Sequence, residues 1–66
     1  MQFYRDKLGN VVRIHSNAEP GSPEFFCAVA DVRNLQGEWK PWDFWGSEYM
    51  REIFEAGYFI PLMRVA

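Results

Sequence analysis

Two four-residue turns constrain the fold of this chain more than any other feature. Asp6-Lys7-Leu8-Gly9 and Asn34-Leu35-Gln36-Gly37 each begin with an Asx residue and end with a glycine. This pattern is typical of a type I turn followed by a residue with positive φ, which joins two antiparallel strands. Because the turn sets which residues face each other, the sequence predicts two hairpins with defined registers.

The first predicted hairpin runs from Gln2 to Ile14. Pairing Asp6 with Asn10 divides its side chains between two faces, because alternate residues of a strand point to opposite sides. The core face is then expected to hold Tyr4, Val12 and Ile14, and the other face Phe3, Arg5, Val11 and Arg13. The second face, with two arginines beside an aromatic ring, is either a solvated surface or a recognition patch.

The longest predicted strand covers Glu24 to Arg33, and both of its faces are largely apolar. One face carries Phe26, Ala28, Ala30 and Val32, and the other carries Phe25, Cys27 and Val29. A strand covered on both sides has this composition. We expect a helix to approach the alanines, and we interpret Cys27 as a small buried hydrophobe rather than a reactive thiol.

The second predicted hairpin leads into a tryptophan-rich segment, Glu38 to Gly46. Its register pairs Asn34 with Glu38 and Arg33 with Trp39, so the Arg33 guanidinium is expected to lie on the Trp39 indole. All three tryptophans of the chain fall in this segment. Each buries about 150–250 Å² when it packs. The segment is therefore either the hub of the core or a binding surface.

One helix and one further strand complete the predicted chain order. The helix is capped by Asp43 or Ser47 and ends at about Ala56, with Gly57 as the left-handed residue that follows. Its apolar side is predicted to hold Trp45, Tyr49, Ile53 and Phe54. The last strand is predicted over Tyr58–Val65. Pro41 and Pro61 each place their strand at a sheet edge or bend it.

These elements predict a single α+β domain over residues 1–66, in the chain order ββββαβ. We expect an antiparallel sheet of four to five strands with one helix packed on one face. The alternative is a small SH3-like barrel, in which the second face of the sheet becomes the interior. A domain of this size buries only about 60% of its unfolded surface, so a partner or a second copy is an expected source of stability.

Composition and motifs argue against several functions. Seven basic and nine acidic residues give a net charge of −2, which disfavours a general polyanion binder. One Cys and one His cannot complete a zinc site, and no apolar run approaches the roughly 20 residues of a membrane span. No nucleophile motif or phosphate loop is present, and no sequence neighbour partners His15. We expect a soluble cytosolic protein with no enzymatic activity and no cofactor or metal.

A lone helix covers only one face of such a sheet, so the opposite face is expected to bind something else. The predicted binding residues on it are Phe3, Arg5, Arg13, Phe25, Val29, Arg33 and Trp39. We interpret the chain as a non-catalytic protein-binding module, acting on a protein partner or on its own copy as a homodimer. Single-stranded nucleic acid, bound through aromatic and Arg/Lys side chains, is the alternative, and sugar binding is a weaker third possibility.

Overall fold

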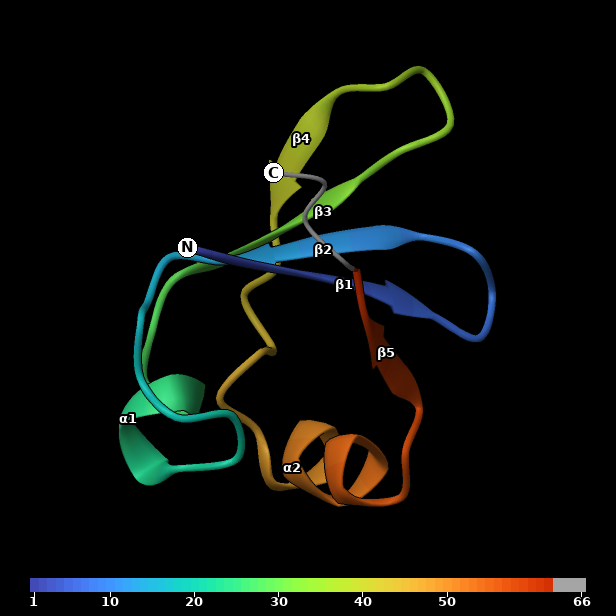
Figure 1. Cartoon of the computed structure of the whole chain (residues 1–66). Coiled ribbons are helices and arrows are strands. Elements are labelled where there is room, and N and C mark those ends of the chain that lie inside the picture. The colour runs from blue at the N-terminus through green and yellow to red at the C-terminus, as the bar shows by residue number, and fades with distance from the viewer. Residues whose placement is uncertain (63–66) are drawn as a thin grey trace.

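A computed structural model describes residues 1–62 as a five-stranded antiparallel sheet with two helices on one face (Figure 1). The strands are β1 (Gln2–Asp6), β2 (Val11–Ile14), β3 (Ala30–Arg33), β4 (Trp39–Pro41) and β5 (Phe59–Pro61), and the helices are α1 (Pro23–Phe26) and α2 (Glu48–Glu55). The strand order across the sheet is β4-β3-β2-β1-β5. The predicted α+β class is confirmed.

Both predicted hairpin registers are confirmed. Tyr4 faces Val12, and the Asp6 N–H donates to the Asn10 carbonyl at 3.0 Å. In the second hairpin Arg33 faces Trp39, and the Asn34 N–H donates to the Glu38 carbonyl at 2.9 Å. The glycines that end the two turns have φ of +88° and +84°, as the turn chemistry requires.

The first half of the long predicted strand is wrong, because residues Pro23–Phe26 form α1 and β3 begins only at Ala30. Ser22 is the N-cap of α1, and its hydroxyl accepts from the Phe25 N–H at 3.3 Å. Pro23 follows at the start of the helix, where its missing N–H costs nothing. These local preferences outweigh the apolar run that favours a strand, and both phenylalanines of α1 are buried.

Trp45 is the centre of the core. Its side chain is 1% exposed, and its indole Nε1 donates to the Phe25 carbonyl at 3.0 Å. Its ring contacts the rings of five other aromatic residues: Phe25, Phe26, Trp42, Phe54 and Phe59. The backbone packs closely here as well, because a Cβ on Gly46 would lie 2.9 Å from the Phe26 carbonyl oxygen.

Helix α2 begins and ends where the sequence predicts. The Ser47 hydroxyl caps it by accepting from the Met50 N–H at 3.2 Å, and Gly57 follows with φ of +84°. Its inward side is different from the prediction, since Met50 is buried while Tyr49 is 68% exposed. Successive residues of a helix are about 100° apart, so a helix that turns Met50 inward carries Tyr49 to its flank.

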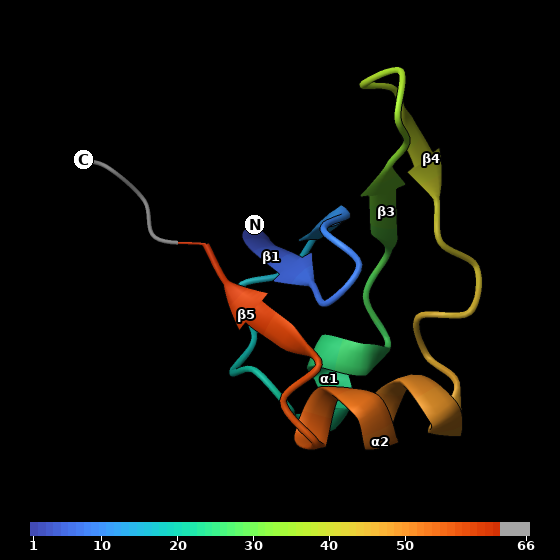
Figure 2. The same ribbon diagram turned by 90° about the vertical axis from the view of Figure 1, so that its right-hand side faces the viewer.

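Both helices lie on the same side of β1 and β2 (Figure 1), next to the face that carries Tyr4, Val12 and Ile14. The β3–β4 hairpin projects toward the opposite side (Figure 2). Within residues 1–62, no strand pairing joins β4 to β5, so the sheet is open and the alternative barrel is not formed. The tail of the predicted last strand, Met63 to Val65, lies outside the described residues.

Neither helix of residues 1–62 combines the length and the apolar character that crossing a bilayer requires.

Candidate binding surface on the outer face of the sheet

The face of the sheet that turns away from the helices, hereafter the outer face, carries the candidate site. In the part of the chain that the structure describes, no helix packs on it. The register places alternate residues of β1 to β4 on this face: Phe3, Arg5, Val11, Arg13, Asp31, Arg33 and Trp39. Aromatic rings and arginines therefore share one surface.

Arg13 occupies the middle of the outer face and is held from two directions. Its Nε donates to Oδ2 of Asp31 at 2.8 Å, directly across from it on β3. Its guanidinium carbon lies 4.2 Å from the centre of the Trp39 ring. Phe3, on β1, also contacts Trp39, and the centres of the two rings are 6.4 Å apart. No hydrogen bond within residues 1–62 uses the two terminal nitrogens of Arg13, so its outward N–H donors are available to a ligand.

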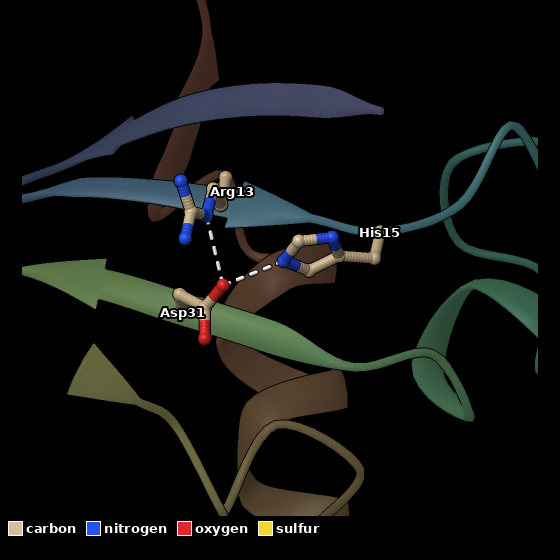
Figure 3. Close-up of polar contacts among 3 residues, drawn as sticks. All are labelled: Arg13, His15 and Asp31. Carbon is tan, nitrogen blue, oxygen red and sulfur yellow. Dashed lines mark hydrogen bonds and ion pairs between the residues drawn. The ribbon is translucent and has the colours of Figure 1, made fainter. Parts of the chain in front are cut away.

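Asp31 anchors this arrangement. Nε2 of His15 lies 2.6 Å from the same Oδ2 and donates to the carboxylate, so two side chains converge on one oxygen (Figure 3). The Asp31 side chain is 13% exposed. The hydrogen bond from His15, followed by that from Arg13, lowers the pKa of the Asp31 carboxyl below its ordinary value, against the opposing effect of burial. The carboxylate is therefore ionised at neutral pH.

The His15–Asp31 pair orients an imidazole, which is one component of general-base catalysis. The Asp31 carboxylate holds Nε2, and the backbone N–H of His15 donates to the Val29 carbonyl at 2.8 Å. Within residues 1–62, no hydroxyl or thiol is hydrogen-bonded to His15, and no group of three or more His, Cys, Asp or Glu side chains is placed to hold a metal ion. His15 therefore holds the Asp31 carboxylate in place, and this carboxylate positions Arg13.

The structure brings together three of the predicted binding residues, Phe3, Arg13 and Trp39, and exposes Arg5 and Arg33 on the same face. The guanidinium on Trp39 belongs to Arg13, and the expectation of Arg33 there is wrong. Nε of Arg33 instead donates to the Gly37 carbonyl of its own hairpin at 3.3 Å. The contact of Trp39 with Arg13 thus spans β3, from β4 to β2.

Two other predicted binding residues lie elsewhere. Phe25 is fully buried in the core, so its predicted place on the open face is wrong. Val29 is 66% exposed but precedes β3, beside His15. Cys27 is exposed at the end of α1 rather than buried, because the chain there is a helix terminus and not the middle of a strand. All three corrections have one cause, the helix that replaces the first half of the predicted strand.

Asp31 is the site residue that sequence reasoning missed. It interrupts the otherwise apolar run of residues 25–32, which is an unusual place for a carboxylate. Pairing the second strand with the third places it directly opposite Arg13. The position of Asp31 in the apolar run could have drawn attention to it. Its pairing with Arg13 could be predicted only by also predicting that the second strand pairs with the third.

The three tryptophans divide between core and surface. Trp45 is buried in the core. Trp42 is half-buried, and the centre of its ring lies 6.1 Å from the centre of the Trp45 ring and 5.9 Å from the centre of the Phe59 ring. Trp39 alone lies on the outer face, half-buried against Phe3 and Arg13. The segment from Glu38 to Gly46 therefore contributes Trp45 to the centre of the core and Trp39 to the candidate binding surface.

The open edges of the sheet are poor places for a partner strand. In β4, the Trp42 N–H donates inward to Ala30, so the nitrogen of Pro41 points to the open edge. In β5, the Leu62 N–H donates inward to Phe3, so the nitrogen of Pro61 points outward in the same way. Each edge lacks one N–H donor where a new strand would need it. A strand added at either edge would therefore leave one of its own carbonyls without a donor.

No protein-family model, curated protein or solved structure matches this chain significantly. The chemistry of its surfaces is therefore the basis for a functional proposal.

Proposed function

We propose that this chain is a non-catalytic protein-binding module whose outer face receives an acidic surface of a partner protein. The observation that carries the proposal is the arrangement of Arg13, which is bonded to Asp31 and stacked on Trp39 with its terminal N–H groups unused. Arg5 and Arg33 are exposed on the same face, whereas Asp31, the one acid placed on this face within residues 1–62, is already paired. The free charge of the outer face is therefore positive.

Preorganisation favours binding at this site. A free arginine side chain carries about 2 kcal/mol of rotamer entropy, part of which is lost when it binds a ligand. In this protein the Asp31 bond and the Trp39 ring already restrict Arg13 before any partner arrives. A planar guanidinium matches the two oxygens of a carboxylate. Trp and Arg are also the residues most enriched among interface hot spots.

Titration with simple probes tests the proposal. The probes are a peptide of about ten residues rich in Glu, a matched Ser/Gly peptide, and a thymidine oligonucleotide of similar length, followed by calorimetry at low salt, where charge attraction is least screened. We expect binding of the acidic peptide alone, weakened about tenfold or more by Arg13→Ala, as for loss of one charged contact worth about 1.4 kcal/mol. Arg51→Ala is the control, because Arg51 lies on α2, away from the outer face.

Equal effects of the two alanine variants, or no binding of the acidic peptide by the wild-type protein, would contradict the proposal. Arg13→Lys separates charge from shape, since lysine keeps the charge but not the planar fork. We expect it to bind between wild type and Arg13→Ala.

Single-stranded nucleic acid is the second candidate, because Phe3 and Trp39 flank a guanidinium on one face and bases stack on such rings. The oligonucleotide arm of the titration decides between the two. Tighter binding of the oligonucleotide than of the acidic peptide, with a steep dependence on salt, would favour this candidate.

A further inference from the structure

We infer that the acidic partner of the outer face is a second copy of this chain, which presents the exposed side of α2. This inference rests on the proposed function and names its partner. It follows from a separation of charge in the fold, with arginines on the outer face and glutamates on the opposite side of the molecule.

The glutamates of α2 form one stripe. Glu48, Glu52 and Glu55 are spaced by four and three residues, so they lie on the same side of the helix. All three are exposed, and Met50 on the opposite side is buried. No ion pair within residues 1–62 involves them. Arg51 is exposed among them, so this side of α2 carries three negative charges and one positive charge, and the excess of negative charge is available to basic groups outside the molecule.

Exposed aromatic side chains accompany this stripe. Tyr49 on α2 is 68% exposed, and Phe44, in the turn just before the helix, is 73% exposed. The outer face carries the half-buried rings of Phe3 and Trp39. The two surfaces therefore match in both respects, arginines facing glutamates and aromatic rings on each side, which is the composition of a binding patch.

The arrangement predicts head-to-tail association. The outer face and α2 lie on opposite sides of the sheet, so one copy uses its sheet while the next uses its helix (Figures 1 and 2). Such heterologous contacts produce rings or open stacks rather than a two-fold dimer. A two-fold contact between two outer faces would instead place arginines against arginines, which is unfavourable. We expect assembly that grows with concentration and weakens with salt.

Mixing two charge-reversed variants tests the inference with the protein alone. Arg5→Glu combined with Arg33→Glu disables the outer face and leaves α2 intact, and Arg13 and its bonds are kept. Glu48→Lys combined with Glu52→Lys disables α2 and leaves the outer face intact. All four side chains are exposed, so both variants should fold, which circular dichroism and the urea midpoint verify.

We expect the wild-type protein to form species larger than a monomer in sedimentation velocity at low salt. Each variant alone should be monomeric, with self-association weakened at least tenfold. Their equimolar mixture should associate again, into species that contain the two variants in equal numbers, because the native Arg–Glu pair of surfaces and the reversed Glu–Lys pair are both complementary in charge. Restoring association only on mixing is the signature of a head-to-tail contact.

A wild-type protein that stays monomeric at high concentration and low salt would overturn the inference, and so would a mixture that stays monomeric. If the chain is monomeric but its outer face still binds the Glu-rich peptide, the self-association inference fails while the proposed function stands. If neither the peptide nor a second copy binds, both fail.

Discussion

Arg13 and Trp39 meet on the outer face although their strands are not neighbours. Arg13 is on β2 and Trp39 on β4, with β3 between them, yet the guanidinium carbon lies 4.2 Å from the centre of the indole ring. Asp31, on the intervening strand, accepts the Nε–H of Arg13. Three consecutive strands thus build one cationic, aromatic site, and each of its parts can be tested separately.

Replacing Asp31 by Asn should make stability less dependent on pH. The pKa of the Asp31 carboxyl is lowered in the folded protein, so its stabilising effect is full above the ordinary value of 3.8 and is lost as pH falls through the lower folded value. At pH 7 we expect Asp31→Asn to cost about 1.5–3 kcal/mol, the range for hydrogen bonds to charged groups. Urea unfolding at pH 7 and in acid measures this, and the two proteins should converge in acid.

An equal loss at both pH values would show that the Asp31 charge is not what stabilises the pair. Glu24→Gln is a suitable control, because Glu24 is an exposed acid that makes no ion pair within residues 1–62.

Trp45 should be the least replaceable of the three tryptophans. Trp45→Phe keeps a ring but leaves the Phe25 carbonyl without its donor, which costs about 1–3 kcal/mol. Trp45→Ala should cost about 3–5 kcal/mol, comparable with the roughly 3–10 kcal/mol that a chain of this length has in total. Denaturation followed by circular dichroism should show a lowered free energy of unfolding for Trp45→Phe and a largely unfolded Trp45→Ala protein.

Trp39→Phe, on the outer face, is the control, and its free energy of unfolding should be close to that of the wild type. A larger loss of stability for Trp39→Phe than for Trp45→Phe would contradict this description of the core.

The edge prolines should protect the protein from aggregation. Replacing Pro41 and Pro61 together by Val restores an N–H donor on each open edge and adds a residue that favours strands. We expect faster growth of light scattering and of thioflavin fluorescence on prolonged incubation. Pro20→Val is the control, since Pro20 is exposed in the loop before α1 and pairs with no strand. Equal aggregation of the control and the double variant would show that the edges are not responsible.

Local sequence chemistry predicted the hairpins well. The Asp6 and Asn34 turns determine their own registers over a few residues, and the core face of Tyr4, Val12 and Ile14 follows directly from the first. Helix α1 escaped prediction because its four residues carry no helical periodicity and sit in an apolar run. Only Ser22 and Pro23 marked its start, as an N-cap followed by a proline at the first helical position.

The sequence predicted several residues of the candidate site, but it did not predict which of them contact each other. Phe3, Arg13 and Trp39 were each identified from strand alternation, which depends only on neighbours in sequence. Their meeting depends on how β3 brings β2 and β4 together, which no local pattern encodes. The pairing of His15 with Asp31 depends on the same long-range contact between β2 and β3.

The central claim is that the outer face of the sheet binds an acidic partner, and the tryptophan indole signals in a nitrogen–proton correlation spectrum test it most directly. Trp39 lies on this face, while the Trp45 indole is buried and bonded to the Phe25 carbonyl, so one spectrum contains both probe and control. On addition of the Glu-rich peptide, we expect the Trp39 signal to shift in a saturable way and the Trp45 signal to stay in place. A Trp39 signal that does not move while the peptide is bound elsewhere, or no change anywhere in the spectrum, would contradict the account.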